Sequence, residues 1–322
     1  MTKILYNDGI DAAGKKILID AGIEVSTDKI PQEKLNDALK NFEGIVVRSA
    51  TTVRKDLIDV LPNLKLIGRA GVGMDNIDVK YAREKGLAVV NTPAASSESV
   101  AELVFAHFFT MARFLHDSNR KMPAAETKEA FDVLKKKYSA GIELKGKTLG
   151  IIGAGMIGKA VARIALGLGM NVVFHRTSDE DVILDFTFHP NVSSQKVYFT
   201  FKCVSFEKLL AEADFISLHV PFPKGTPPII AKREFGLMKK GVAIVNTARG
   251  GVISEVDLLE ALNEGKVAYA GMDVFEGEPI IKKELREHPN VSLSPHIGGS
   301  TKEAQERIGI ELATKVVEYF KK

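Results

Sequence analysis

The sequence predicts an α/β protein made of two successive units, each built around a doubly wound parallel sheet. Short β-branched segments alternate with helical ones from the N-terminus to about residue 93, and the alternation resumes near residue 148. This rhythm is typical of parallel strands that are joined by helical crossovers. The length of 322 residues points the same way, because one hydrophobic core rarely serves so long a chain.

The first unit opens with a strand at KILYN, which is followed by a helix over DAAGKKILIDAG. Further strands are expected at GIVVRS (44–49), LKLIGRAG (64–71) and LAVVNTP (87–93).

A buried helix is expected over the apolar run from Val100 to Leu115. The run is interrupted by Glu102, His107 and Arg113, and it is shorter than the roughly 18 uninterrupted apolar residues that a membrane span needs. Ser99 with Glu102 predicts a capping box at its start, and the helix is expected to end near Arg113.

The second unit follows a polar, lysine-rich connection or arm from Lys121 to Gly146. One later segment, from about 184 to 206, alternates apolar and polar residues around an Asn- and Ser-rich turn, which predicts an inserted hairpin. Ser300 with Glu303 predicts the cap of a last helix. The expected strands of the second unit are TLGIIG, NVVFHR, DFISLHVP, GVAIVNTA, AYAGMDV and VSLSP.

The composition narrows the classes of function. A lone cysteine, Cys203, excludes an internal disulfide and a cysteine-rich metal site, so we expect no metal and a cytoplasmic location. The start MTKILYNDG reads as a strand rather than a signal peptide. A net charge of +3 without a long basic run argues against nucleic acid as a partner and is compatible with small acidic ligands.

The stretch GAGMIG is the strongest local motif. Gly153, Gly155 and Gly158 have the G-x-G-x-x-G spacing, with a strand before them and a helix after them. The first glycine permits a tight turn, the second lets the backbone approach a pyrophosphate, and the third allows close packing of helix on strand. We therefore expect a dinucleotide at this helix N-terminus.

The next strand, NVVFHRTS, ends without the carboxylate that usually binds the ribose of NAD. Arg176 stands in its place and is followed by Thr177 and Ser178, a set that suits a 2′-phosphate. NADP is therefore favoured over NAD. In the alternative, Arg176 stacks on adenine while Asp179 or Asp181 reaches the ribose.

Three polar residues follow later strands, where an open α/β sheet binds its ligand. Arg249 can grip the carboxylate of a keto acid with its forked guanidinium. His296 can give a proton to the carbonyl oxygen and take it back, and Glu278 can fix the imidazole tautomer and raise its pKa. Such a set suits hydride transfer at a carbonyl beside a carboxylate. His219 also lies at a strand end, where we expect it to shape the cofactor cleft.

Taken in order, GAGMIG, ADFISLHVP, MKKGVAIVNTARGG, MDVFEGEP and SPHIGGST resemble the D-isomer-specific 2-hydroxyacid dehydrogenases over almost the whole chain. The resemblance implies that Arg249 binds substrate, that His296 is the acid/base and that Glu278 orients it. It also implies that Asp273 meets the nicotinamide amide. Further cofactor contacts are expected at Met156, Ile157, Val220, Pro221, Thr226, Thr247, Ala248 and Gly298.

The resemblance implies a domain arrangement as well. A Rossmann nucleotide domain, residues 99–296, would be inserted into a flavodoxin-like substrate domain made of residues 1–98 and 297–322. The substrate would lie in the cleft between the two. The family also pairs through the helix after VVNTP, so a homodimer is expected, although that helix could pack within its own subunit only.

Within the family, VVRSATTV and IGRAGVGMDNID most resemble phosphoglycerate dehydrogenases. Arg48 and Ser49 could hold a phosphate, and the N–H groups of Gly71, Val72 and Gly73 could meet the substrate carboxylate. For Arg48 the alternative is a surface ion pair. The chain ends just after the returning helix, so a C-terminal regulatory domain is not expected.

Several departures from the pattern keep other functions open. Arg176 replaces the usual acid, Ser96 replaces an asparagine before the central helix, and the stretch from Glu278 to His296 is short. A glyoxylate or hydroxypyruvate reductase that uses NADPH is the nearest rival to a 3-phosphoglycerate dehydrogenase. A nucleotide-sensing corepressor of the same fold is a rival of another class, against which Arg249, Glu278 and His296 together favour an enzyme.

Overall fold

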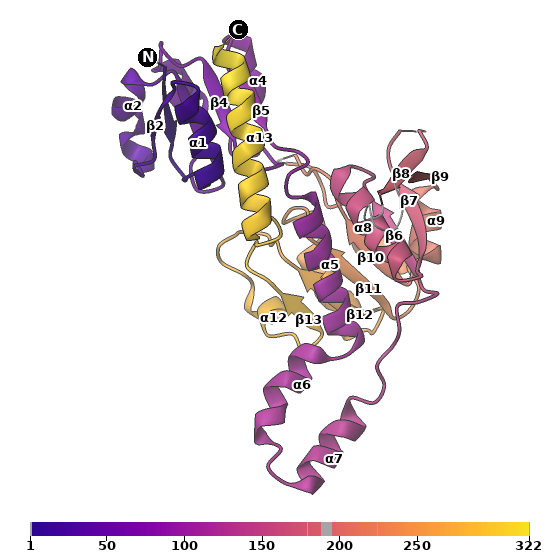
Figure 1. The fold of residues 1–322 in the computed structure, drawn as a ribbon. Helices are drawn as coiled ribbons and strands as arrows, with labels where there is room; N and C mark the ends of the chain where they lie inside the picture. Colours follow the sequence, from indigo (N-terminus) through magenta and orange to yellow (C-terminus); the bar gives the residue numbers. More distant parts are fainter. Residues whose placement is uncertain (1, 179, 188–194, 224, 322) are drawn as a thin grey trace. The chain divides into compact units, whose positions relative to one another are not determined.

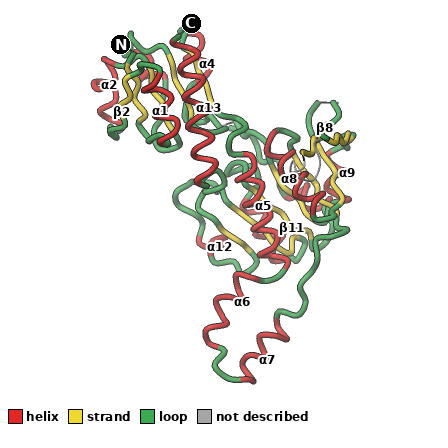
Figure 2. Tube along the Cα trace, in the orientation of Figure 1, coloured by secondary structure: helices red, strands yellow, loops and turns green. Residues whose placement is uncertain are grey.

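The computed structural model describes residues 2–178, 180–187, 195–223 and 225–321. They form two compact units, residues 1–99 with 299–322 and residues 100–298 (Figure 1). In both units, helices flank a sheet of parallel strands (Figure 2), which confirms the predicted α/β class. No helix in the described part of the chain is long and apolar enough to cross a membrane.

The smaller unit has the strand order β2-β1-β3-β4-β5. The order reverses between β1 and β3, and such a switch point is where parallel α/β sheets bind ligands. The strands are β1 (Lys3–Tyr6), β2 (Glu24–Ser26), β3 (Gly44–Val47), β4 (Leu66–Arg69) and β5 (Ala88–Asn91).

Both faces of this sheet are covered. Helices α1 and α13 pack on one face through residues such as Leu18 and Leu312, and α2, α3 and α4 pack on the other through residues such as Leu35 and Leu57. The helices are α1 (Ala12–Asp20), α2 (Leu35–Ala38), α3 (Lys55–Asp59), α4 (Val79–Glu84) and α13 (Lys302–Phe320), with short 3₁₀ turns at Gln32–Lys34 and Leu39–Asn41.

The larger unit has the strand order β13-β12-β11-β10-β6-β7, and every neighbouring pair is parallel. Here the order reverses at β6, which directly precedes the glycine turn. The strands are β6 (Thr148–Ile152), β7 (Asn171–His175), β10 (Phe215–Leu218), β11 (Val242–Asn246), β12 (Val267–Met272) and β13 (Val291–Leu293). Strands β10 and β11 are buried along their whole length, as their largely apolar sequences predict.

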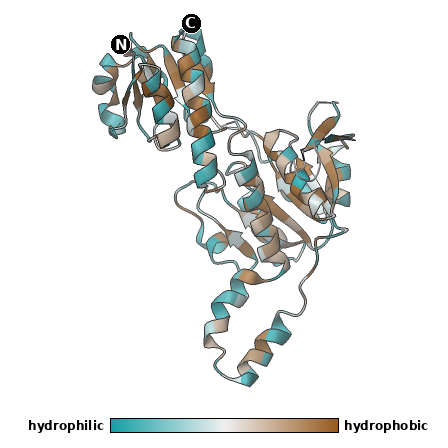
Figure 3. Ribbon diagram, viewed as in Figure 1, coloured by the Kyte–Doolittle hydropathy of each residue, from teal (hydrophilic) through white to brown (hydrophobic). Residues whose placement is uncertain are grey.

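Helices cover both faces of this larger sheet too. One face packs against α5 (Ser97–Ala112) and α8 (Met156–Gly167). The other packs against α9 (Phe206–Glu212), α10 (Lys232–Leu237), α11 (Glu255–Asn263) and α12 (Lys283–Arg286). Colouring by hydropathy shows the sheet strands largely brown and the outer helices mixed with teal (Figure 3).

The arm expected between 121 and 146 contains helical structure. Helix α6 (Leu115–Lys121), a 3₁₀ turn (Met122–Ala124) and α7 (Lys128–Lys137) project from the larger unit (Figure 1).

The inserted hairpin is confirmed. Strands β8 (Val182–Thr187) and β9 (Lys196–Phe201) pair antiparallel and form a sheet of their own. The predicted Asn- and Ser-rich turn between them falls mostly on residues 188–194, outside the described part of the chain.

Two predicted helix starts are wrong, by three residues for α5 and by one for the last helix. Helix α5 begins at Ser97, so Ser99 lies in its first turn instead of capping it, and the helix ends at Ala112. The last helix is capped by Thr301, whose hydroxyl accepts from the Ala304 amide, and not by Ser300. A capping motif marks a helix start to within a turn, and neighbouring Ser and Thr residues compete for the cap position.

Candidate active site

The glycine turn joins β6 to α8 at the switch point of the larger sheet. Gly153 has φ 101°, and a Cβ there would collide with the His219 carbonyl. A Cβ at Gly158 would collide with the Gly153 carbonyl. Gly155, by contrast, is the N-cap of α8 and has open space where its side chain would be. The turn thus leaves the first amides of α8 accessible, and a pyrophosphate fits there.

The side chains around this turn differ in exposure. Met156 is 52% exposed and Ile157 is half-buried in the first turn of α8. Val220 and Pro221 follow β10, and the exposed Thr226 donates its hydroxyl proton to the Pro223 carbonyl at 2.8 Å.

His219 is bound inside the unit. Its Nε2 lies 2.8 Å from the Ser217 hydroxyl, and burial lowers the pKa of His219 to about 3. An imidazole that stays neutral at neutral pH is not suited to act as the catalytic acid.

The end of β7 carries the residues expected at the adenosine. Arg176 Nη2 lies 3.0 Å from the Glu180 carboxylate, and the two side chains are 30% and 74% exposed. Thr177 is exposed, whereas the Ser178 hydroxyl is buried and has no hydrogen-bond partner among the described residues. Of the two alternative ribose ligands, Asp181 is exposed and Asp179 lies outside the described residues.

The turn after β11 presents Arg249. Asn246, fully buried at the strand end, accepts from the Ala248 amide at 3.0 Å and donates to the Arg249 carbonyl at 2.9 Å. These bonds fix the backbone of the turn that carries the half-buried Arg249 side chain. Thr247 is 8% exposed, and its buried hydroxyl has no partner among the described residues, so it is a further donor for a ligand.

His296 and Glu278 form a pair at the carboxyl end of the sheet. His296 Nδ1 lies 2.9 Å from Glu278 Oε2, and Glu278 Oε1 accepts from the Phe275 amide at 2.9 Å. The Glu278 hydrogen bond raises the pKa of His296, while burial opposes the shift. Burial also opposes the shift at Glu278, yet the bonds from His296 and Phe275 hold the pKa of that carboxyl below its usual range. With Nδ1 engaged, Nε2 is the atom that can exchange a proton with a ligand.

Asp273, which follows β12, is buried and only 1% exposed. Its Oδ1 accepts from the Ser294 hydroxyl at 2.6 Å and from the Ile297 amide at 2.9 Å. Its Oδ2 accepts from the Gly298 amide at 2.9 Å. Asp273 therefore fixes the backbone that follows His296.

Two residues that sequence reasoning missed contribute here. Ser294 joins Asp273 to His107, and Asn246 orders the turn of Arg249. The sequence signals were a histidine inside a largely apolar helix and an asparagine ending an apolar strand.

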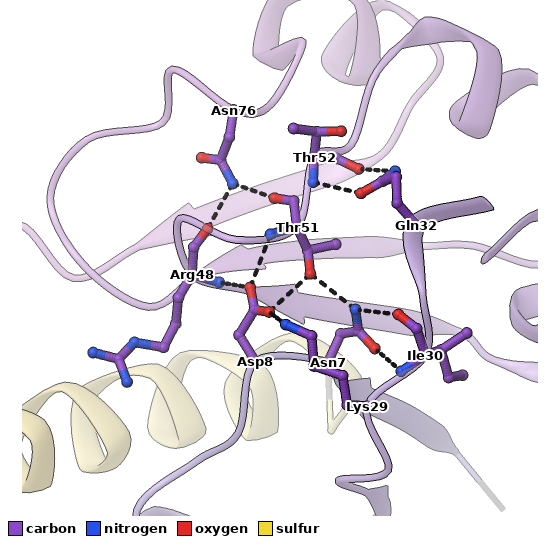
Figure 4. A network of polar contacts seen from close by, with 9 residues as sticks. All are labelled: Asn7, Asp8, Lys29, Ile30, Gln32, Arg48, Thr51, Thr52 and Asn76. Atoms are coloured by element: carbon purple, nitrogen blue, oxygen red, sulfur yellow. Dashed lines mark hydrogen bonds and ion pairs between the residues drawn. The ribbon is translucent and has the colours of Figure 1, made fainter. Parts of the chain in front are cut away.

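Arg48 and Ser49 lie in the smaller unit, after β3 and beside its switch point. Asp8, whose side chain is 5% exposed, organises this loop: it accepts from the Arg48 amide at 2.7 Å, from the Thr51 amide at 3.2 Å and hydroxyl at 2.9 Å, and it pairs with Lys29 at 2.6 Å (Figure 4).

Amide side chains hold the same loop from two sides. Asn76 donates to the carbonyls of Arg48 and Thr51, both at 2.6 Å, and Asn7 donates to the Thr51 hydroxyl at 2.8 Å (Figure 4). The loop is therefore rigid, while the Arg48 guanidinium extends away from the network toward α13 (Figure 4).

The glycines after β4 lie in the same unit. Gly71 has φ 139°, and a side chain there would collide with Arg69. The Val72 carbonyl accepts a hydrogen bond from the Asn91 side chain at 2.7 Å, and Gly73 is half-buried.

Comparison with known proteins identifies the family. The model of the D-isomer specific 2-hydroxyacid dehydrogenase NAD binding domain matches residues 105–298. A hydroxypyruvate reductase of Thermotoga maritima is 41% identical over 318 residues, which cover 98% of this chain and 97% of that protein. A D-3-phosphoglycerate dehydrogenase of Methanocaldococcus jannaschii is 42% identical over 317 residues, 98% of this chain but only 57% of that protein.

Solved structures agree with this result. The crystal structure of a glyoxylate reductase from Paecilomyes thermophila superposes with a TM-score of 0.84 at 31% identity, covering 100% of this chain and 96% of that one. The chain belongs to the D-isomer specific 2-hydroxyacid dehydrogenases, as its motifs predict.

Proposed function

We propose that this D-2-hydroxyacid dehydrogenase interconverts 3-phosphoglycerate and 3-phosphohydroxypyruvate, with residues 99–296 binding the cofactor and residues 1–98 and 297–322 binding the substrate. The observation that carries the chemistry is the His296–Glu278 pair with Arg249 on the neighbouring turn.

Each catalytic group has one task. A bound nicotinamide supplies or accepts the hydride at C2 of the substrate. In reduction, His296 Nε2 gives its proton to the carbonyl oxygen, and in oxidation the neutral ring takes the hydroxyl proton. Glu278 holds the Nδ1 proton and keeps the ring oriented. Arg249 aligns the substrate carboxylate through two parallel N–H donors.

The proposed place of the phosphate is beside Arg48. Arg48 lines a cavity of about 290 Å³ in the smaller unit, together with Gln305 and with Asp8 and Asp11, whose carboxylates already accept from the Arg48 and Ala13 amides. The Asp8 network occupies the backbone of the loop and leaves the guanidinium available. An anionic group beside Arg48 would gain a charge-assisted contact, which is the main support for a phosphorylated substrate.

NADP is the proposed cofactor, with NAD as the alternative. Arg176 pairs with an exposed carboxylate, and such a surface pair contributes about 0–1 kcal/mol, so a 2′-phosphate can replace it. The buried Ser178 hydroxyl is a second donor at the same strand end. Replacing Arg176 by Ala should raise the KM for NADPH about 10-fold or more and leave that for NADH nearly unchanged.

Glu180→Gln provides the matched comparison for Arg176. It removes the competing carboxylate and keeps the arginine, so it should lower the KM for NADPH. Equal effects of Arg176→Ala on NADPH and NADH would instead support the adenine-stacking alternative.

A second candidate is an NADPH-dependent reductase of glyoxylate or hydroxypyruvate. Arg176 favours it, because a reductase is driven by a reduced cofactor pool, and the Thermotoga relative named hydroxypyruvate reductase matches along nearly its whole length.

Initial rates decide between the two. NADH and NADPH oxidation should be measured with 3-phosphohydroxypyruvate, hydroxypyruvate and glyoxylate. A kcat/KM that is highest for the phosphorylated acid, and that falls in Arg48→Gln for this acid alone, would support the first proposal. Turnover of the small acids only would support the second. Undiminished turnover in His296→Ala would exclude both.

A homodimer is also proposed. Much of the apolar run in α5 packs inside its own unit, but Phe109 of this helix remains 42% exposed. The α6–α7 arm adds Leu115, Phe131 and Val133, which are 58%, 47% and 66% exposed. Exposed apolar side chains gathered on a projecting arm favour an interface. Light scattering that gives a monomer mass at micromolar concentration would count against it.

A further inference from the structure

A buried histidine with no part in the proposed chemistry lies in the core of the larger unit. His107 belongs to α5 and is 4% exposed. A Cβ at Gly271 of β12 would lie 2.8 Å from the His107 Cβ and 2.9 Å from its Cγ. The glycine therefore leaves the space that the histidine occupies. Burying an imidazole is unfavourable unless its nitrogens are hydrogen-bonded.

Both ring nitrogens of His107 have partners. Nδ1 lies 2.8 Å from the Ser292 hydroxyl and Nε2 lies 3.0 Å from the Ser294 hydroxyl. Ser294 donates its only hydroxyl proton to Asp273 Oδ1, so it can only accept from His107. Nε2 therefore carries the ring proton, and Nδ1 accepts from Ser292. The bonds run in one direction, from Ser292 through His107 and Ser294 to Asp273.

The charge state of the ring agrees with this direction. Burial lowers the pKa of His107, and the nearby Asp273 carboxylate opposes only part of the shift. The ring is thus neutral at neutral pH and has one N–H to donate. In a buried chain of hydrogen bonds each bond polarises the next, so the proton on Nε2 strengthens the bond that Ser294 makes to Asp273.

This series of hydrogen bonds ends at the backbone beside His296, the acid–base residue of the proposed function. Asp273 accepts from the amides of Ile297 and Gly298, the two residues after His296. His296 itself has φ 52°. A non-glycine residue in the left-handed region is strained and persists only where its surroundings hold it. The two bonds to Asp273 hold the residues that follow His296, the His296 amide donates to the Ser294 carbonyl at 3.1 Å, and the ring bonds Glu278.

We propose that His107 is a positioning residue for the acid–base step: through Ser294 it holds Asp273, and through Asp273 it holds the His296 turn that places the imidazole against Glu278. The inference rests on the proposed function, in which His296 exchanges the proton. It adds a buried residue of α5 that has no part in the proposed chemistry itself.

The test compares two substitutions of His107. His107→Leu fills the space but removes both bonds, so the His296 turn relaxes and its pairing with Glu278 weakens. The expected kcat for 3-phosphohydroxypyruvate or hydroxypyruvate reduction falls about 10- to 100-fold, the range that misplacement of a catalytic group produces. KM changes far less, and the alkaline limb of the kcat/KM profile moves to lower pH, because His296 loses part of the bond that raises its pKa.

His107→Gln is the rescue variant. Its amide can donate to Ser294 and accept from Ser292, so kcat should stay within about fivefold of the parent and the limb should stay in place. His116→Leu, a substitution of an exposed histidine in α6, controls for losing a histidine. If His107→Leu does not fold, Ser294→Ala cuts the same chain between His107 and Asp273 and should move kcat and the limb in the same direction.

The outcomes separate the inference from the proposed function. A folded His107→Leu or Ser294→Ala protein with parental kcat and an unmoved limb would overturn the positioning role, even if its melting temperature fell. The same would follow if His107→Gln lost as much kcat as His107→Leu. Full activity in His296→Ala would instead remove the proposed function on which the inference depends.

Discussion

At the scale of single residues, the proposed acid–base pair shows how the surroundings of a group set its pKa. His296 and Glu278 are each only partly buried, yet their mutual bond moves both pKa values apart, upward for the imidazole and downward for the carboxyl. The pair therefore exists as imidazolium and carboxylate over a wider pH range than either group alone.

Glu278→Gln tests this coupling. Without the carboxylate the pKa of His296 falls, so in reduction, which needs the protonated ring, activity should be lost at lower pH than in the parent. In oxidation, which needs the neutral ring, activity should appear at lower pH. We also expect kcat to fall roughly 100-fold, because the ring loses its orientation.

The measurement is the kcat/KM profile from pH 5 to 10 in both directions. Glu287→Gln, which neutralises an exposed carboxyl outside the site, is the control. Limbs that stay in place in Glu278→Gln would show that another group sets the pKa of His296.

At the scale of elements, a loop is ordered by side chains from segments that are far away in the sequence. The loop after β3 depends on Asp8 from the end of β1 and on Asn76 from the segment before α4 (Figure 4). Burial alone would raise the pKa of Asp8, but the bonds from Lys29, Arg48 and Thr51 hold this pKa below its usual range.

Asp8→Asn should loosen this loop. Oδ2 of Asp8 accepts from the two backbone amides, while Oδ1 accepts from the Thr51 hydroxyl and Lys29. An amide has one acceptor oxygen, so Asn keeps only one of these two sets of bonds, which costs about 1–3 kcal/mol of stability. The KM for 3-phosphohydroxypyruvate should rise, because Arg48 is mounted on the loop, while that for glyoxylate should not. Comparing the two KM values checks the prediction, and Asp20→Asn on the exposed end of α1 is the control.

The same carboxylate gives the smaller unit a pH dependence. A group whose pKa is lowered by folding stabilises the folded state above its unfolded pKa, near 3.9 for Asp, and this contribution disappears as pH falls through the lowered folded value. The difference in stability between parent and Asp8→Asn should therefore be present at pH 7 and shrink in acid. A difference that is constant down to pH 2 would contradict the assignment.

At the scale of the whole molecule, the chain forms two compact units with separate cores. The residues proposed to bind the cofactor all lie in the larger one. A ligand that binds only the folded form, present at a free concentration 100 times its Kd, stabilises that form by about 2.7 kcal/mol.

Calorimetry with saturating NADPH should therefore raise the unfolding transition of the larger unit and leave that of the smaller unit in place. The Arg48→Gln protein should show the same shift. A single transition that moves as a whole would show that the two units unfold together.

The sequence by itself determined the α/β class, the glycine turn, the hairpin and the family, because each depends on local periodicity or on short ordered motifs. It also singled out the residues of the candidate site by their positions after predicted strands. The start of α5 at Ser97 was missed by three residues and the cap of the last helix at Thr301 by one, since neighbouring hydroxyl residues are equivalent until the backbone is placed.

Only the tertiary structure decided how the candidate residues are held. His107 meets Ser292 and Ser294 across 185 and 187 residues of chain, and Asp8 meets Thr51 across 43. Hydrogen bonds between segments so far apart leave no local pattern in the sequence. The left-handed backbone of His296 has the same origin, because it is maintained by bonds that exist only after the sheet has brought Asp273 beside it.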